Sequence, residues 1–348
     1  MNNTQLEIGN YKVLIVGTGG REAAITAALK RSRHNIEIVA IGNNQNPTMI
    51  QNNVKIISLN HVIEIANYAK DNNFNMVIVG PEQYLNDGVA NELNKLNIPC
   101  IGPTKELARI ETDKFFARKL LNNLGDGHFN PIYKEFNKFD QNEIHTFLET
   151  INNSFVVKNI GLCGGKGVKV MGRDFITVDE GLQYCKELID TTGICLIEEK
   201  LEGIEFSLMT FTDGFSFSHM PIVHDYKRLN NNDLGPQTGG MGCITNNSLD
   251  NNNFMNPIKR LEIELFNEIV ILELQKECGQ LYKGIIYGSY MLTNNGNIKV
   301  IEYNCRFGDP ESINVLSLLS TDFMDICCHI SNSKLKDIEI KYQKNATC

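Results

Sequence analysis

Short apolar runs separated by polar and glycine-containing segments dominate the first hundred residues of the chain. Each run is too short for a buried helix and predicts a buried strand. Helical patterns lie between several of the runs, near residues 20–30 and 87–96 and from about residue 61. Strands that alternate with helices predict a parallel sheet covered on both faces, so the expected fold class is α/β. The predicted strands cover residues 11–16, 37–41, 54–58, 76–79 and 99–101.

The order of elements changes after Gly102-Pro103-Thr104, where glycine and proline predict a domain boundary. A long helical pattern over residues 105–124 leads into a small α+β unit, and more strands and helices follow it. Asn294-Asn295-Gly296 favours a hairpin turn between the last two strands. Beyond the long helix, strands are expected at residues 155–158, 168–171, 194–199, 206–212, 215–223, 284–293 and 297–304, and helices at 178–190, 256–278, 312–319 and 322–331.

The first strand ends in Gly17-Thr18-Gly19-Gly20-Arg21-Glu22, directly before a predicted helix. This layout presents free backbone N–H groups at a helix start, which suits a phosphate. The dinucleotide fingerprint needs a third glycine where Glu22 stands, so a nicotinamide dinucleotide site is disfavoured. A site for a smaller phosphate and a ligand-free turn both remain open.

Two further glycine-rich segments have no helix start beside them. The segment at residues 161–167 joins two predicted strands, so it differs from a Walker loop. Its backbone would close on a phosphate chain, with charge from Lys158 and Lys166; a merely flexible hairpin is the alternative. Residues 235–242 hold four glycines and a proline, which predict an irregular loop that is either filler or a close-fitting ligand surface.

The strand predicted at residues 297–304 carries a pair of oxygen donors. Glu302 and Asn304 are two residues apart, so both side chains point to one face about 6.7 Å apart and reach one hard cation. Arg306 follows them, before a Gly-Asp-Pro turn, and adds a fixed positive charge. Such a group suits Mg²⁺ and a polyphosphate. An edge strand with solvated polar side chains is the alternative.

Composition narrows the class of protein. The net charge of −8 argues against broad nucleic-acid or membrane binding. No apolar run approaches the ~20 residues of a membrane span, and the N-terminus lacks a signal-peptide pattern. Ten scattered cysteines form no CxxC pair, so we expect reduced thiols and no structural zinc. A soluble, cytoplasmic protein is predicted.

Taken in order, these segments resemble the phosphoribosylamine–glycine ligase (glycinamide ribonucleotide synthetase) family of the ATP-grasp superfamily, from Tyr11 to about Asp325. The most specific similarity lies in Glu302-Tyr303-Asn304-Cys305-Arg306-Phe307-Gly308-Asp309-Pro310-Glu311 and Gly235-Pro236-Gln237-Thr238-Gly239-Gly240-Met241-Gly242. Shorter matches add to it at residues 17–22, 80–82, 102–104 and 164–168.

The resemblance implies an N-terminal Rossmann-like domain over residues 1–103 and a two-lobed ATP-grasp domain over residues 104–335. A small lid would cover about residues 129–199, with ATP between the lobes. Family members carry a further C-terminal domain, whereas residues 336–348 form only a tail. We therefore expect that domain to be absent, with divergence, an incomplete sequence or a protein partner as the explanation.

The resemblance also implies roles for single residues. It implies Mg²⁺ or Mn²⁺ at Glu302 and Asn304, and catalytic roles for Arg306, Lys166, Asp225 and Lys227. ATP would meet Lys114, Lys158, Gly164, Gly165, Lys166, Gly167, the hinge residues Glu198, Glu199 and Leu201, and Glu205 at the ribose. Glycine and phosphoribosylamine would meet Gly17, Gly19, Gly20, Arg21, Gly80, Pro81, Glu82, Arg228, Thr238, Gly239, Gly240 and Met241.

The implied reaction is an ATP-dependent ligation of purine biosynthesis. The glycine carboxylate attacks the γ-phosphate to give glycyl phosphate, and the amine of phosphoribosylamine then displaces phosphate. Several positions depart from the family pattern: Ala23 replaces His, Tyr226 replaces His, Gln237 replaces Asn, Ile313 replaces Gln, and Asn159-Ile160-Gly161 replaces Ala-Asp-Gly. A ligase for another carboxylate and amine, and a non-catalytic ATP-binding protein, therefore remain as alternatives.

Overall fold

A parallel five-stranded sheet forms the N-terminal part of this computed structural model, which describes residues 7–124, 127–159, 161, 167–231, 234–245 and 255–348. The strand order is β3-β2-β1-β4-β5. Alternate residues of β1 enter different cores, because Leu14 and Val16 pack on one face and Val13 and Ile15 on the other. The predicted α/β class, with a doubly covered sheet, is confirmed. The elements are β1 (Asn10–Val16), α1 (Gly20–Lys30), β2 (Asn35–Ile41), α2 (Pro47–Gln51), β3 (Lys55–Ile57), α3 (Val62–Asp71), β4 (Met76–Val79), α4 (Glu82–Asn86), α5 (Val89–Lys95) and β5 (Cys100–Ile101).

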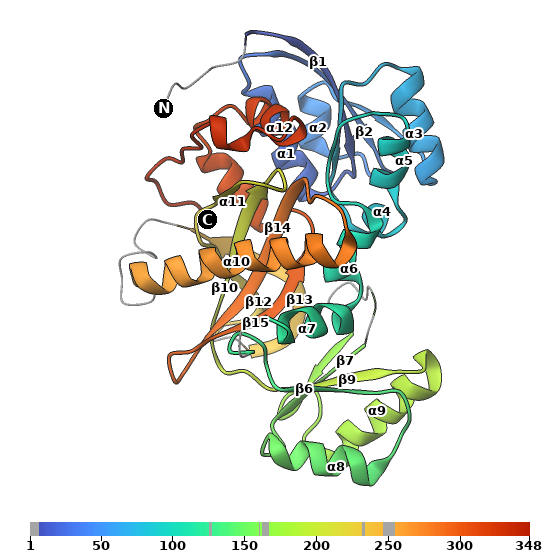
Figure 1. The fold of residues 1–348 in the computed structure, drawn as a ribbon, viewed down its shortest axis with the longest axis vertical. Helices are drawn as coiled ribbons and strands as arrows, with labels where there is room; N and C mark the ends of the chain where they lie inside the picture. Colours follow the sequence, from blue (N-terminus) through green and yellow to red (C-terminus); the bar gives the residue numbers. More distant parts are fainter. Residues whose placement is uncertain (1–6, 125–126, 160, 162–166, 232–233, 246–254) are drawn as a thin grey trace.

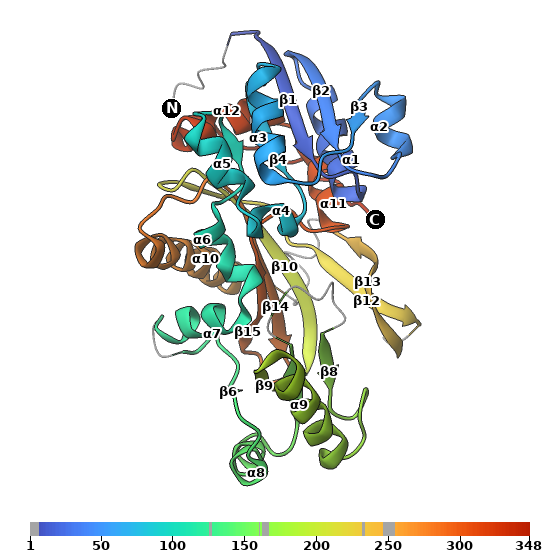
Figure 2. The ribbon, with the colours of Figure 1, turned by 90° about the vertical axis from the view of Figure 1, so that its right-hand side faces the viewer.

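An antiparallel sheet of order β11-β10-β14-β15 lies between the N-terminal sheet and a small lobe (Figure 1). The two-stranded sheet of β12 and β13 stands beside it (Figure 2). The C-terminal helices return to the N-terminal sheet, where the Arg31 side chain donates to Leu316 O. The elements are α6 (Lys105–Thr112), α7 (Lys114–Asn122), β10 (Gly203–Thr212), β11 (Phe217–His219), β12 (His224–Asn230), β13 (Leu234–Ile244), α10 (Pro257–Cys278), β14 (Gly284–Thr293), β15 (Ile298–Asn304), α11 (Glu311–Leu318), α12 (Phe323–Ser331) and η1 (Leu335–Asp337).

The small lobe has a hydrophobic core of its own. Its antiparallel sheet has the order β6-β9-β7-β8, and α8 and α9 cover one face (Figure 1). Phe155, Leu182 and Ile197 are among the buried residues of this core. As predicted, β7 and β8 form a hairpin around the glycine-rich loop. The lobe consists of β6 (Tyr133–Phe136), α8 (Gln141–Thr150), β7 (Phe155–Lys158), β8 (Val168–Val170), α9 (Val178–Thr192) and β9 (Cys195–Glu199).

The helix predicted over residues 105–124 is two helices. Asp113 has an extended backbone, and its side chain accepts a hydrogen bond from Phe116 N. Asp113 therefore caps a new helix and ends the preceding one. Lys114 becomes the first residue of α7 instead of a mid-helix residue. The helix predicted at 87–96 is likewise preceded by a separate short helix, α4.

The irregular loop predicted at residues 235–242 is wrong, because this segment lies within strand β13. It pairs with β12 (His224–Asn230), a strand that was not predicted. The ladder shifts register twice, around Tyr226, Arg228 and Asn230, and Gly235 and Gly240 adopt positive φ. The glycines therefore occupy an irregular strand rather than a loop. The strand predicted at 215–223 is only the short β11.

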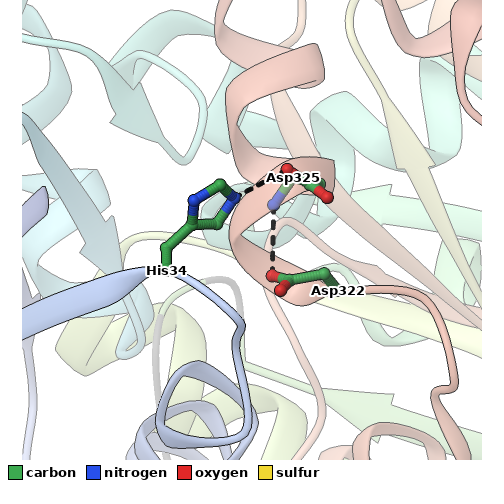
Figure 3. A group of neighbouring side chains, drawn as sticks. All are labelled: His34, Asp322 and Asp325. Atoms are coloured by element: carbon green, nitrogen blue, oxygen red, sulfur yellow. Dashed lines mark hydrogen bonds and ion pairs between the residues drawn. The ribbon is translucent and has the colours of Figure 1, made fainter. Parts of the chain in front are cut away.

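His34, Asp322 and Asp325 lie together and superficially resemble a metal site (Figure 3). His34 Nδ1 accepts a hydrogen bond from Gly9 N, so Nε2 carries the proton and donates to Asp325 Oδ1 at 2.8 Å. Asp322 caps α12 and accepts hydrogen bonds from the Ser32 hydroxyl and Met324 N. The imidazole has no lone pair left for a metal, so the cluster joins the N-terminal sheet to α12. No helix in the described part of the chain is long and apolar enough to cross a membrane.

Candidate active site

Two adjoining cavities lie where the small lobe, the antiparallel sheet and the N-terminal sheet meet. Their volumes are about 390 Å³ and 1230 Å³. The smaller cavity reaches Arg21 and Glu82 of the N-terminal sheet, and the larger follows residues 199–205 at the edge of the small lobe. Both are lined by Lys158, Val168, Glu198, Asp225, Lys227, Ile301 and Glu302.

Strand β15 presents the predicted oxygen donors to this shared boundary. Glu302 and Asn304 line the smaller cavity, while Tyr303 between them turns into the core, where its hydroxyl bonds Asn267. Among the described residues, none donates a hydrogen bond to the Glu302 carboxylate. Burial would raise the pKa of Glu302, but the charges of Lys227, Lys158, Lys114 and Arg306 outweigh it and lower the pKa. This side chain is therefore an ionised carboxylate with free lone pairs.

Arg306 is held by three side-chain oxygen groups and by the Phe307 carbonyl oxygen. Its Nη2 lies 2.7 Å from Glu111 Oε1 and 3.2 Å from Asn304 Oδ1, and its Nε lies 3.2 Å from Glu82 Oε2. Burial raises the pKa of Glu111. At Glu82 burial would also raise the pKa, but the charges of Arg306 and Arg21 together with a backbone hydrogen bond outweigh it and lower the pKa. The guanidinium thus links the N-terminal sheet to the donor strand. No local sequence pattern marks Glu111 as a site residue.

A buried charge triad lies on the small-lobe side of the boundary. The Arg118 guanidinium contacts Glu198 through two bonds, Nε to Oε1 at 2.6 Å and Nη2 to Oε2 at 2.9 Å. Lys158 Nζ lies 2.6 Å from Glu198 Oε2. Burial would raise the pKa of Glu198, but the two cations outweigh it and lower the pKa to about 2. Arg118 also donates to Ile301 O at 2.6 Å, so it connects α7, β9 and β15.

Strand β12 supplies a second charged group. Lys227 pairs with Glu205 of β10 and lies 3.3 Å from Asp225 Oδ2. Burial raises the pKa of Asp225 to about 6, and Lys227 only partly opposes this effect. Glu205, which the resemblance placed at the ribose, is here the partner of Lys227 at the edge of the larger cavity.

Three buried polar atoms near β12 and α11 have no hydrogen-bond partner within the described part of the chain. They are Asp225 Oδ1, Glu311 Oε2 and Ser312 Oγ. Asp225 and Glu311 line the smaller cavity, and the other Glu311 oxygen accepts from the Tyr287 hydroxyl at 2.8 Å. Leaving such an atom unpaired costs about 1–3 kcal/mol. This cost is expected where a ligand supplies the missing partner.

Carboxylates occupy the predicted phosphate site at the start of α1. Gly19 N donates to Glu22 Oε2 at 2.6 Å, and Arg21 N donates to Asp309 Oδ2 at 3.2 Å. A Cβ at Gly17 or Gly80 would collide with the Glu22 side chain. These glycines therefore make room for Glu22. The Arg21 guanidinium bonds Glu22 and Phe307 O, and Pro81 lies against Gly17.

Most of the remaining predicted residues that the structure describes line one of the two cavities. Lys114 Nζ donates to Gly161 O at 2.7 Å, and Glu199 accepts from Ile132 N at 2.9 Å. Leu201 and Gly167 line the larger and smaller cavities, respectively. On β13, Thr238 Oγ1 donates to Lys227 O and accepts from Gly240 N, while Arg228 donates to Gly235 O. Met241 is exposed, Gly20 lies beside Asp309, and Gly239 is part of β13. Gly164, Gly165 and Lys166 lie outside the described residues.

Comparison with known proteins identifies the family. The model of the phosphoribosylglycinamide synthetase N domain matches residues 11–111, and the model of its ATP-grasp (A) domain matches residues 112–312. The chain belongs to the phosphoribosylglycinamide synthetase family. A phosphoribosylamine–glycine ligase of Methanocella arvoryzae is 42% identical over 340 residues, which cover 97% of this chain and 76% of that protein. One from Methanocaldococcus jannaschii is 37% identical with the same coverage of each chain.

Solved structures agree with this family assignment. A phosphoribosylamine–glycine ligase from Thermotoga maritima superposes with a TM-score of 0.74 at 25% identity, covering 95% of this chain and 78% of that one. The residues that depart from the family pattern lie in different surroundings. Ala23 is buried in α1, whereas Tyr226 of β12 and Ile313 of α11 are about half exposed. The backbone of Gln237 pairs with Arg228.

Proposed function

We propose that the protein is an ATP-dependent ligase that joins glycine to 5-phosphoribosylamine and forms glycinamide ribonucleotide, ADP and phosphate. The observation that carries this proposal is the Glu302 carboxylate, which lines both cavities, is kept ionised by the charges of four cations and receives no hydrogen bond from the described residues. It stands at the boundary of the two cavities, where a polyphosphate tail entering from the larger one would meet a carboxylate substrate in the smaller one. Membership of the synthetase family supports this choice of substrates.

The nucleotide half would use the larger cavity. The backbone of Glu199 and Leu201 would hold the adenine, because the Glu199 carboxylate is already engaged by Ile132 N. Lys114 and Lys158 would bind phosphate oxygens, together with Lys166 of the glycine-rich hairpin. We propose that residues 129–199 form the lid of an ATP-grasp domain that begins near residue 104, and that the lid excludes water from the acyl phosphate.

The donor set on β15 fits a hard divalent cation. A carboxylate without a hydrogen-bond partner and an amide oxygen, two residues apart, are ligands that Mg²⁺ or Mn²⁺ accepts. Glu302 and Asn304 would hold the ion. When bound, it would neutralise charge on the phosphates and polarise the γ-phosphate.

The first chemical step forms glycyl phosphate. A glycine carboxylate oxygen attacks the γ-phosphorus, and the bond to the bridging oxygen breaks to release ADP. Arg306 would orient the carboxylate, since Glu82 and Glu111 fix the guanidinium beside Asn304. Positioning and charge neutralisation supply the rate enhancement, so no side chain needs to become a covalent nucleophile.

The second step forms the amide. The amine of phosphoribosylamine attacks the glycyl carbonyl, the carbon–oxygen bond to phosphate breaks, and the nitrogen loses one proton. Asp225 Oδ1 is buried, unpaired and in the smaller cavity, so we assign it to accept a hydrogen bond and then the proton from an attacking amine. Lys227 would stabilise the ionised form of Asp225.

Phosphate release from ATP and Mg²⁺ tests the proposal. We expect release only when glycine and phosphoribosylamine are both present, with one glycinamide ribonucleotide formed per phosphate. Release that needs a different amine would favour a ligase of other specificity. Nucleotide binding without turnover, under conditions where the Thermotoga maritima relative is run in parallel as a positive control, would favour a non-catalytic ATP-binding protein.

A further inference from the structure

Helix α10 is apolar on two opposite sides. Its inner side, with Ile263, Phe266 and Leu274, packs into the main hydrophobic core. Its outer side carries five large apolar side chains that are between 48% and 78% exposed, and these are Ile258, Leu261, Leu265, Ile269 and Leu272. Figure 1 shows α10 across the front of the molecule and Figure 2 shows it at the left-hand edge, and in neither view does a described helix or strand cover its outer side.

The five side chains, here called the outer stripe, form a continuous seam. With 3.6 residues per turn they fall within about 80° of the helix circumference, and they extend over most of its length of about 33 Å. Spacings of three and four residues are typical of a helix that packs lengthwise against another helix. Singly scattered exposed apolar residues need no explanation, but an aligned row of five indicates a contact surface.

The order of the spacings points to a particular occupant. From Ile258 to Leu272 the intervals are three, four, four and three residues, the same from either end. A second copy of α10 lying antiparallel would therefore place Leu265 opposite Leu265, Ile258 opposite Leu272 and Leu261 opposite Ile269. Such self-complementarity about one residue is the requirement of a two-fold symmetric interface.

The charges beside the outer stripe agree with this arrangement. Lys259 and Glu273 lie on the same flank at opposite ends of α10, so the antiparallel pairing brings Lys259 of one copy near Glu273 of the other. In the isolated chain, Lys259 bonds Gly296 O and Glu273 pairs with the exposed Lys276, and both contacts are weak enough to exchange. Glu262 and Glu268 also flank the stripe, whereas membrane-binding helices carry Lys and Arg there.

We propose that two copies of this chain associate in solution through antiparallel packing of α10, with the two-fold axis at Leu265. One helix pair buries less than the ~1,600 Å² of a standard interface, so we expect a dissociation constant in the micromolar range. No residue of α10 lines either cavity of the candidate active site, so the association leaves both cavities open.

Sedimentation equilibrium of the full chain tests the association. We expect a monomer–dimer equilibrium, and a Leu265→Glu dissociation constant at least about 100-fold larger, because two carboxylates would be buried face to face. Ile176→Glu, at an exposed apolar position of the small lobe, is the matched control and should dimerise like the wild type. A wild-type chain that stays monomeric through the micromolar range, or a Leu265→Glu variant that still dimerises, would overturn the proposal.

Cysteine cross-linking tests the register. Leu265→Cys should form an intermolecular disulfide on mild oxidation, because equivalent residues meet at the two-fold axis. Ile258→Cys should not cross-link with itself, since the two copies would lie about 21 Å apart along the helix, but it should cross-link with Leu272→Cys in a mixed sample. The unmodified chain gives the background from its own cysteines. Self-cross-linking of Ile258→Cys would indicate another register and reject the antiparallel interface.

Discussion

On the small-lobe side of the cleft, Glu198 lies 2.6 Å from both Arg118 Nε and Lys158 Nζ, whereas on the β12 side Asp225 and Glu311 each keep a buried oxygen without a described partner. The first carboxylate has its pKa lowered to about 2 by its cations, and Asp225 has its pKa raised to about 6 by burial. Both are buried acids in one cleft. The fold already supplies hydrogen-bond partners to both oxygens of Glu198, whereas one oxygen of Asp225 needs a ligand to supply its partner.

This contrast suggests that the two sides of the cleft have different roles in ligand binding. If the Lys158 ammonium turns toward a phosphate, Glu198 keeps its two hydrogen bonds to Arg118 and does not become an isolated buried anion. On the other side, an incoming amine would pair with Asp225 Oδ1. Under the proposed function, Arg118, Lys158 and Glu198 (the nucleotide half) would thus be ordered before binding, whereas Asp225 and Glu311 (the acceptor half) would be completed by the amine substrate.

The largest effect is expected at the boundary between the two halves. Glu302→Ala removes the one carboxylate of the donor pair on β15 and should lower the rate of phosphate release at least about 10³-fold. The variant should stay folded with a modestly lower melting temperature, because the Glu302 side chain receives no hydrogen bond from the described residues but its lowered pKa means that the folded state favours the ionised carboxylate. Steady-state phosphate release and thermal unfolding check both points. A wild-type rate would reject the assignment of Glu302 as a metal ligand.

Asp225→Asn should affect the acceptor half alone. We expect about a 10²-fold loss in kcat/KM for the amine substrate, with the affinity for ATP unchanged. In the wild type, kcat/KM should rise with pH through about 6, because Asp225 must lose its proton to accept one. The variant should lack this limb of the pH profile. An unchanged limb in Asp225→Asn would assign the titration to another group.

Arg118→Gln tests the nucleotide half, with an expected rise of about 10-fold or more in the dissociation constant for ATP. Without Arg118, the Glu198 carboxylate would retain Lys158 as its sole cationic partner. Adding Glu198→Gln removes the anion, so the double variant should recover most of the affinity. A purely structural role for Arg118 predicts no recovery. Binding of ADP measured by calorimetry separates this result from any loss of turnover.

Much of the fold follows from local sequence pattern. The apolar runs predict β1 and β4, and the alternation around Glu302 and Asn304 predicts the donor strand β15, because these signals need only neighbouring residues. Asn294-Asn295-Gly296 likewise predicts the turn between β14 and β15. The strand at residues 235–242 was not predicted, because glycine has a low propensity for strands. This strand forms through its pairing with β12, which local sequence does not reveal.

The parts of the site that were missed depend on contacts far apart in the sequence. Arg118 resembles an ordinary solvated residue of a helix, and only its contacts with Glu198 and Ile301 reveal a buried role. Its one local signal is its position four residues after Lys114, on the same helix face. Glu22 shows the converse: the glycines before it suggest a phosphate site, whereas they make room for its own carboxylate.

The smallest effect is on stability, and its sign should differ between the two halves. At pH 7, Glu198→Gln should destabilise the protein by about 1–3 kcal/mol, because it removes a carboxylate whose folded pKa lies below the unfolded value. That contribution is present above pH 4.5 and is lost as the pH falls toward 2. Asp225→Asn should instead stabilise the ligand-free protein by a similar amount, since burial raises the pKa of Asp225 from 3.8 to about 6, so that its cost to stability builds up between these two pH values and is complete above about pH 6. Near pH 3, below the unfolded pKa of 3.8, the Asp225→Asn effect should vanish, because aspartate is then largely protonated in both the folded and the unfolded states. Chemical denaturation at both pH values measures the four differences. Equal signs at pH 7 would mean that the acceptor half is satisfied without its substrate.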